Sequence, residues 1–207
     1  ADKNPNVYLP DVALTLNNLG LLNRDENRMT EARQAFEEAL KLYRGFADND
    51  PNIYLFYLAA TLNNLGLLNR DENRITEARH AYEEALKIRR ELADKNPNVY
   101  LPDVAATLNN LGLLNLVEKR MTEARQAFEE ALKLCRGLAD KNPNVYLPDV
   151  AETLNNLGLL NRDEKRMAEA RQAYEDALNI YRDFAKISPA AYEPYLRKVQ
   201  LNLDALP

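Results

Sequence analysis

The sequence is poor in the residues on which most catalytic and metal sites depend. It has one cysteine, Cys135, which excludes an internal disulfide and any metal site built from several cysteines. It has one histidine, His80, which excludes most histidine-based metal sites. Its six glycines are scattered and form no phosphate-binding loop. We therefore expect no catalytic residues, no cofactor and no bound metal, in a protein that is not an enzyme.

Long apolar runs and an excess of positive charge are also missing. No stretch approaches the roughly 18 consecutive apolar residues that cross a bilayer. The 27 basic residues stand against 32 acidic ones, for a net charge of −5. We therefore expect neither a membrane nor a nucleic acid as a partner. Because the sequence starts without a methionine or a signal segment, we expect a fragment of a longer, cytoplasmic protein.

What the sequence does contain is one unit, repeated. Its copies occupy residues 1–46, 47–92, 93–138 and 139–184, and a half-copy occupies residues 185–207. The first and third copies differ at only six positions. Because one unit of this kind cannot bury both of its apolar faces, the copies must stack on one another. We predict a single domain over the whole chain.

Each unit is predicted to form two helices. The first spans about residues 10–26 of the first unit and the second about residues 31–46, because apolar residues recur there at helical spacing. The half-copy predicts a last, capping helix over residues 192–203, with polar residues on one face. The fold class is therefore all-α, a solenoid of about nine helices.

Local signals set the expected helix ends. Pro10 suits the first turn of a helix, and Thr30 suits the N-cap of the second helix. Asn27 lies between the two and tolerates the left-handed conformation of a tight turn. Asn4-Pro5 and Pro10 together are expected to end one unit and start the next.

The stretch LNNLGLLNRDENRMTEARQAFEEAL resembles the tetratricopeptide repeat, and its LNNL wording is similar to the kinesin light chain type of repeat. The residues that carry the resemblance in the first unit, with counterparts in the other three, are Leu16, Leu19-Gly20, Ala32, Phe36 and Ala39. The resemblance implies a right-handed α-solenoid. Glycine and alanine then allow the two helices to approach closely, and the aromatic ring fills the space beside them.

The unit departs from this family in two ways. It has 46 residues where about 34 are usual, and we expect the extra ones, in RGFADKNPNVYLPD, to lengthen the second helix and the connection. Asn23 and its counterparts also stand where an aromatic residue is usual.

The resemblance implies that the first helix of each unit lines a concave groove that binds a protein or an extended peptide. Its exposed stripe then offers asparagines for a peptide backbone, leucines as an apolar row, and arginines for acidic groups. These candidate residues are Asn17, Asn18, Leu21, Arg24, Asn63, Asn64, Leu67, Arg70, Asn109, Asn110, Leu113, Leu116, Asn155, Asn156, Leu159 and Arg162.

Alternatives remain open for two of these groups. The asparagines either clamp a bound peptide or solvate the inner face and bond to neighbouring helices. Leu116-Val117, which replaces Arg-Asp in the third unit, is either drift after duplication or a hydrophobic pocket for a partner's side chain.

The function that follows is a scaffold for protein–protein interaction. The alternative is a structural module that assembles with its own copies through the solenoid ends, end to end or as a dimer.

Overall fold

The structure is a computed structural model that describes residues 5–207, with side chains from Tyr8 onward. In that part of the chain it contains nine helices and no strand, which confirms the all-α, helical-repeat fold. The first helices of the repeats are α1 (Pro5–Asp25), α3 (Pro51–Asp71), α5 (Pro97–Val117) and α7 (Pro143–Asp163). The second helices are α2 (Met29–Asn49), α4 (Ile75–Lys95), α6 (Met121–Ala139) and α8 (Met167–Ile187), and the predicted capping helix is α9 (Pro189–Asp204).

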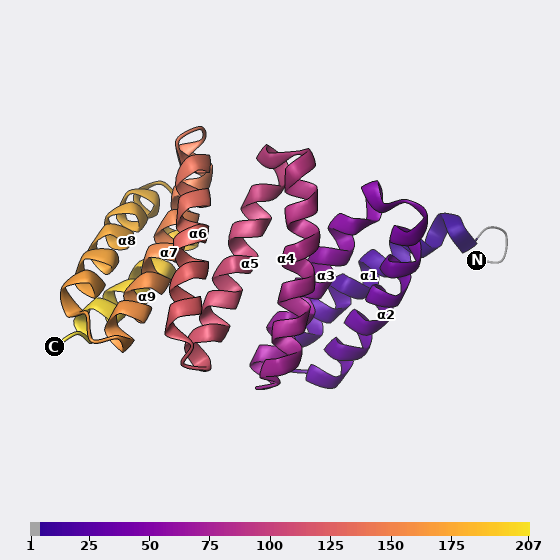
Figure 1. Ribbon diagram of the computed structural model, residues 1–207, viewed down its shortest axis with the longest axis horizontal. Coiled ribbons are helices and arrows are strands. Elements are labelled where there is room, and N and C mark those ends of the chain that lie inside the picture. Colours follow the sequence, from indigo (N-terminus) through magenta and orange to yellow (C-terminus); the bar gives the residue numbers. More distant parts are fainter. Residues whose placement is uncertain (1–4) are drawn as a thin grey trace. The chain divides into compact units, whose positions relative to one another are not determined.

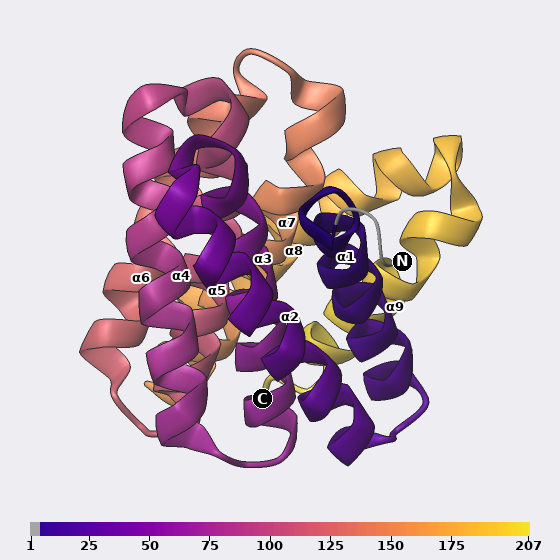
Figure 2. The ribbon, with the colours of Figure 1, turned by 90° about the vertical axis from the view of Figure 1, so that its right-hand side faces the viewer.

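Contacts between the helices divide the chain into two compact units, Ala1–Tyr100 and Leu101–Pro207. In the first unit, α1 packs on α2, α2 on α3 and α3 on α4, so each helix lies against the next one in the chain (Figure 1). Figure 2 brings α1 and α2 of this unit to the front. In the second unit, α6 packs on α7, α7 on α8 and α8 on α9. That all 207 residues form a single domain stays a prediction.

Each first helix begins at the first proline of its repeat. Pro51 and Pro143 stand in the first turns of α3 and α7, where the missing N–H costs no hydrogen bond. Pro10 lies inside α1, and Phe56 holds the same repeat position in α3 without changing where that helix begins. The prediction that Pro10 starts the helix is therefore wrong. The long connection is wrong as well, because only Asp50 separates α2 from α3, and the extra residues lengthen both helices. Asn4 lies outside the described residues.

The turn between the two helices of a repeat is held by backbone hydrogen bonds. Asn27 has a φ of 60°, as predicted for a left-handed residue. The N–H of Arg28 donates to the carbonyl of Asn23 at 2.7 Å, and the N–H of Asn27 donates to the carbonyl of Arg24 at 2.9 Å. These bonds fix the position of Arg28, which is the N-cap residue of α2. The Arg28 side chain makes no capping hydrogen bond. The prediction that Thr30 caps the helix is wrong.

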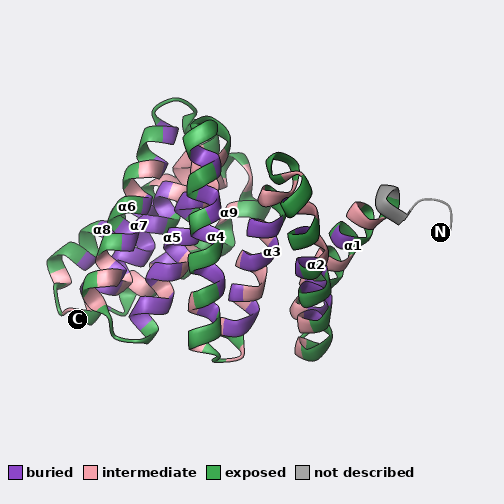
Figure 3. Ribbon diagram, turned by 45° about the vertical axis from the view of Figure 1, so that its right-hand side comes forward, coloured by how far each residue is buried: buried purple, intermediate pink, exposed green. Residues whose placement is uncertain are grey.

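The two helices of each repeat are held close by a glycine that faces an aromatic ring. A Cβ atom added to Gly66 would lie 2.5 Å from Cε1 of Tyr82, much closer than two carbon atoms can approach. The same contact recurs in the other repeats as Gly20–Phe36, Gly112–Phe128 and Gly158–Tyr174. All four rings are fully buried, and Figure 3 shows the buried stripes that run along the helices. The predicted role of the glycine and the aromatic residue is confirmed.

The close approach predicts opposite effects for two Gly→Ala substitutions. Gly66→Ala is expected to lower the free energy of unfolding by about 1–3 kcal/mol, because the new methyl group overlaps the ring of Tyr82. Gly45→Ala, on the exposed side of α2 with nothing within 4 Å, is expected to raise it by up to about 1 kcal/mol. Urea unfolding of both variants measures the difference. Equal changes in the free energy of unfolding for the two variants would contradict the overlap of the Gly66→Ala methyl group with the Tyr82 ring.

The hydroxyl groups of Tyr82 and Tyr174 are buried without a hydrogen-bond partner among the described residues. Burial raises the pKa of Tyr82 from its ordinary value of 10.0 to about 12. The unfolded chain therefore releases the phenol proton at a lower pH than the folded chain does. The free energy of unfolding is unaffected by this difference below pH 10, and it falls as the pH rises from 10 toward 12.

Tyr82→Phe is therefore expected to raise the free energy of unfolding by about 1 kcal/mol at pH 7, because it removes a buried polar group without a partner. It should also reduce the loss of stability between pH 10 and pH 12. Thermal melts across that pH range test both effects. Tyr8→Phe, at a ring that is 58% exposed, is the control and should leave the melting temperature at pH 7 unchanged.

Candidate functional site

The candidate asparagines of the first unit lie on neighbouring first helices. Nδ2 of Asn64, in α3, donates a hydrogen bond to Oδ1 of Asn17, in α1, at 3.1 Å. Asn18 is exposed, whereas Asn17, Asn63 and Asn64 are half-buried. The structure thus brings Asn17 and Asn64 together and leaves both residues half-buried.

The asparagines of the second unit form the same bond but are more enclosed. Nδ2 of Asn156 donates to Oδ1 of Asn109 at 3.4 Å, and Nδ2 of Asn202 donates to Oδ1 of Asn155 at 2.8 Å. Nδ2 of Asn109 also donates to Oγ1 of Thr153 at 2.8 Å. Asn109, Asn155 and Asn156 are buried, and Asn110 is half-buried. In this unit the asparagines bond to neighbouring helices, which was one of the two interpretations of the pattern.

The candidate leucines are packed rather than fully exposed. Leu21 lies against the cluster of Ala32, Phe36 and Leu68, and Leu67 is half-buried. In the second unit, Leu113 and Leu159 lie against the cluster that contains Phe128. Their remaining exposed surface is the part that a partner could contact.

Leu116 belongs to the core of the second unit. It is 8% exposed and packs in one cluster with Leu157, Leu160 and Phe128. Its neighbour Val117 is 57% exposed. The replacement at Leu116 therefore adds an apolar side chain to the core of this unit.

The candidate arginines already have carboxylate partners. Nη2 of Arg24 lies 2.6 Å from Oδ2 of Asp71 in the next repeat, and Arg70 lies 3.3 Å from the same carboxylate. Nη2 of Arg162 lies 3.1 Å from Oδ1 of Asp163. Because each of these positive charges has a carboxylate beside it, the arginines give little reason to expect an acidic partner.

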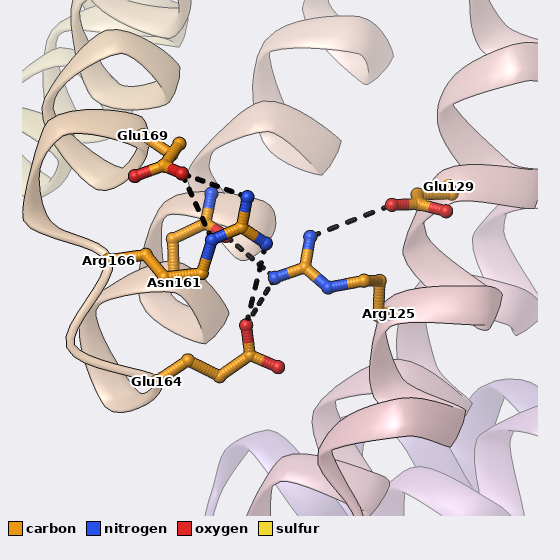
Figure 4. Close-up of polar contacts among 6 residues, drawn as sticks. All are labelled: Arg125, Glu129, Asn161, Glu164, Arg166 and Glu169. Atoms are coloured by element: carbon orange, nitrogen blue, oxygen red, sulfur yellow. Dashed lines mark hydrogen bonds and ion pairs between the residues drawn. The ribbon is translucent and has the colours of Figure 1, made fainter.

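A polar junction joins each described pair of successive repeats within a unit. In the second unit, Nη2 of Arg125 in α6 donates to Oδ1 of Asn161 in α7 at 2.7 Å and pairs with Glu164 (Figure 4). Arg125 also lies 3.6 Å from Glu129, and Arg166 pairs with Glu169 at 2.9 Å.

The first unit repeats this junction. Arg33 of α2 donates to Oδ1 of Asn69 in α3 at 2.8 Å and pairs with Glu72. The asparagine that replaces the usual aromatic residue is therefore the buried acceptor of an arginine from the preceding repeat. Sequence reasoning missed this role. The signal was available, since an arginine and an asparagine recur 36 residues apart.

Two concave regions lie in the first unit. A groove of about 610 Å³ between α2, α3 and α4 is lined mainly by charged residues and by His80. Its charges pair with each other, as Arg44 does with Glu84 at 2.9 Å. A smaller pocket of about 180 Å³ lies where α1, α2 and α3 meet. It is lined by Pro10, Asp11, Leu14, Tyr43, Ile53, Tyr54 and Tyr57.

Of the two repeat positions of Asp11 and Leu14 in this small pocket, one is acidic in the first repeat and both are acidic in the fourth repeat. Asp149 and Glu152 stand where Asp11 and Leu14 stand in the first repeat. Burial raises the pKa of both carboxyl groups, and the Asp149 charge adds to the effect on Glu152 while Lys198 opposes it. The two units therefore differ in the chemistry that they offer at this position.

No group of three or more His, Cys, Asp or Glu side chains in residues 5–207 is placed to hold a metal ion. None of the helices in those residues combines the length and the apolar character needed to cross a membrane.

Comparison with known proteins gives two kinds of similarity. The tetratricopeptide repeat family model matches residues 11–91 and 103–183. BtubC from P. vanneervenii has a crystal structure with a TM-score of 0.72 and 24% identity, covering 96% of this chain and 73% of that one. PilF from Pseudomonas aeruginosa has a TM-score of 0.60 and 21% identity, covering 95% of this chain and 77% of that one. No curated protein matches the sequence.

The junction of Figure 4 predicts strong coupling between its members. Arg125→Ala and Asn161→Ala are each expected to lower the free energy of unfolding by about 1–3 kcal/mol, because the first leaves the buried Oδ1 of Asn161 without its donor and the second removes that acceptor from Arg125. Together they should be non-additive by at least about 0.5 kcal/mol. Urea unfolding of the two single variants and the double variant measures this coupling.

Arg171→Ala is the matched control for the junction. Arg171 holds the same repeat position in α8, but its hydrogen bond is to the carbonyl of Pro207 at 3.5 Å. Arg171→Ala should lower the free energy of unfolding by less than about 0.5 kcal/mol. Additive effects of Arg125→Ala and Asn161→Ala, or an equal effect of Arg171→Ala, would contradict the assignment.

Proposed function

Because the chain belongs to the tetratricopeptide repeat family, whose members generally mediate protein–protein interactions, we propose that it is a non-catalytic scaffold that binds an extended peptide of a partner protein. The site is the face that α1 and α3 form in the first unit. The observation that carries this choice is a pocket lined mainly by apolar and aromatic side chains of α1, α2 and α3, with Asp11 among them, on the helices α1 and α3 that also carry the half-buried Asn17 and Asn64.

The amide groups of Asn17 and Asn64 suit a peptide backbone. Their mutual hydrogen bond uses Oδ1 of Asn17 and one hydrogen of Asn64. It leaves the Nδ2 group of Asn17 as a donor and Oδ1 of Asn64 as an acceptor. A peptide unit presents one acceptor and one donor, so both can be satisfied by this pair.

The small pocket supplies the apolar contact. Leu14 is 43% exposed, and Tyr57, which is 37% exposed, stacks on Tyr43 with ring centroids 5.5 Å apart. Aromatic rings held in this way offer a rigid apolar surface with little entropy left to lose on binding. The pocket of about 180 Å³ has room for one apolar side chain of a bound peptide.

A peptide-display selection on the immobilised chain, followed by calorimetry with the selected peptide, tests this function. Leu14→Glu is expected to weaken binding at least tenfold, because it places a charge in the wall of the pocket. The fourth repeat carries Glu152 at this position, so the variant should fold. Asn17→Ala should weaken binding about threefold to tenfold by removing one backbone contact.

Two matched variants control this experiment. Gln34→Ala removes an exposed amide group from α2, and Leu22→Glu places the same charge about 12 Å from Leu14 along α1. Both variants should bind the selected peptide with the affinity of the original chain. If the Leu14→Glu and Leu22→Glu variants bind that peptide with equal affinity, the site is not on the α1–α3 face.

A further inference from the structure

Three tyrosine rings meet beside α7 in the second unit. Tyr181 of α8 stacks on Tyr195 of α9 with ring centroids 5.6 Å apart, and its centroid lies 6.5 Å from that of Tyr192. The hydroxyl group of Tyr181 donates to the carbonyl of Pro148, in α7, at 3.3 Å. These contacts hold the three rings at the place where α7, α8 and α9 meet.

This place repeats the small pocket of the first unit with two exchanges. Of the seven residues that line that pocket, five recur unchanged at the same repeat positions of the second unit. The stacked ring pair recurs too, with centroids 5.5 Å apart in the first unit and 5.6 Å apart in the second. Leu14 is replaced by Glu152, and Ile53 is replaced by Ala191. The first exchange adds a negative charge and the second removes apolar surface.

Two carboxyl groups of α7 lie beside the rings. Burial, and then the charges of Glu152 and Asp149, raise the pKa of Tyr181. Because Asp149 and Glu152 are three residues apart, they lie on the same side of the helix. Glu152 is exposed, yet burial is the main cause that raises the pKa of its carboxyl group. A group that solvent reaches although protein atoms surround it lies in a depression of the surface.

Neither carboxyl group has a close partner among the side chains that the structure describes. In that part of the chain, no side chain donates a hydrogen bond to Asp149 or Glu152 or forms an ion pair with them. Lys198, at the repeat position of Glu152 in α9, is near enough to lower the pKa of Glu152. Two negative charges therefore face one positive charge. Because a carboxylate that leaves water without a partner is costly, this place favours a further cation.

The surroundings of the two carboxyl groups do not depend on where the sequence begins or ends. Asn156 of α7 donates a hydrogen bond to Asn109 of α5, and Asn155 of α7 accepts one from Asn202 of α9. A first helix of another repeat is thus present on each side of α7.

We propose that Asp149, Glu152 and the tyrosine rings beside them bind an arginine side chain, carried by an extended peptide segment of a partner protein. The guanidinium group donates hydrogen bonds to the two carboxylates and stacks on the ring of Tyr195. This site lies on the face that α7 and α9 form in the second unit. It goes beyond the apolar site on the α1–α3 face, and it selects a partner by charge.

Arginine fits this site better than lysine does. Its guanidinium group is planar and carries five N–H donors, so one group can bond to carboxylates a helical turn apart while its flat face lies on an aromatic ring. The ammonium group of lysine is a compact charge with three donors and does not stack in this way. We therefore expect the site to prefer arginine.

Asn202 supplies a contact for the peptide backbone that carries the arginine. Its Nδ2 group uses one hydrogen in the bond to Asn155, which leaves the second hydrogen as a donor and Oδ1 as an acceptor. Asn202 lies seven residues after Tyr195, about 10 Å along α9. Three residues of an extended peptide span about that distance. A small cation would reach the carboxylates but not this amide group.

The probe is a blocked heptapeptide with arginine at its centre and alanine and glycine elsewhere, titrated into the isotope-labelled chain and followed by NMR. Saturable shifts are expected in α7 and α9, with a dissociation constant below about 5 mM. The same peptide with citrulline, which has the shape of arginine without the charge, should bind at least fivefold more weakly. The peptide with lysine should bind at least twofold more weakly. No saturation, or equal affinity for the arginine and citrulline peptides, would overturn the proposal.

Glu152→Leu locates the bound arginine. The variant carries the residue that the first repeat has at this position, so it should fold, and it should bind the arginine peptide at least fivefold more weakly. Glu175→Leu makes the same exchange at an exposed residue of α8 and is the matched control, with unchanged affinity expected. If the two variants bind the peptide equally well, the arginine does not lie at α7 and the proposal fails.

Lys198→Ala tests the charge balance of the site. It removes the positive charge that acts on Glu152, so the arginine peptide is expected to bind at least threefold more tightly. Lys186→Ala, at a lysine that pairs with Asp183, is the control and should leave the affinity unchanged. Unchanged or weaker binding in Lys198→Ala would contradict a site that lacks one cation.

A single blocked arginine, acetylarginine methylamide, distinguishes a peptide from a small cation. It should bind at least threefold more weakly than the heptapeptide, because it does not reach Asn202. Asn202→Ala should remove this difference. Equal affinity of the two probes for the original chain would identify a small cation as the occupant and overturn the assignment to a peptide. Since these variants lie in α7, α8 and α9, the site is tested independently of the α1–α3 face.

Discussion

The contact between a glycine and an aromatic ring inside each repeat is the constraint on which the other contacts depend. At the Gly66–Tyr82 contact there is no room for even a methyl group. This approach fixes the distance between the two helices of the repeat. It thereby sets where the second helix presents its arginine and where the first helix presents its asparagine. The Arg33–Asn69 bond, at 2.8 Å, then joins the second helix of one repeat to the first helix of the next.

Polar groups, rather than apolar ones, give the stacking of repeats its register. Leucine and alanine side chains tolerate small shifts along a helix, but a buried amide group without its donor does not. The Arg33–Asn69 and Arg125–Asn161 bonds, and the bond of Asn64 to Asn17, each join one repeat to the next at a single position. Together with the backbone turn at Asn27, these bonds fix the register in which one repeat stacks on its neighbour. Binding surfaces built on such a stack are held in place before a partner arrives.

The sequence alone predicted the parts of this structure that depend on local chemistry or on repetition. The helix pairs follow from apolar periodicity, the left-handed Asn27 from its turn, and the Gly20–Phe36 contact from the family pattern. Pro10 and Thr30 misled because each has the local preference for a helix start, whereas the start is set by Pro5 for α1 and by the backbone turn at Asn27 for α2. The asparagines stayed ambiguous for a different reason. Whether Asn109 faces a ligand or a neighbouring helix depends on burial by other repeats, which no residue of its own helix determines.

The bond between asparagines of successive repeats has a polarity. In the three described bonds the later repeat donates and the earlier one accepts, from Asn64 to Asn17, from Asn156 to Asn109, and from Asn202 to Asn155. In α9, however, Leu201 stands where the accepting asparagine would be, and it is 70% exposed. A leucine side chain neither donates nor accepts a hydrogen bond, so α9 takes part in this series only as a donor, through Asn202.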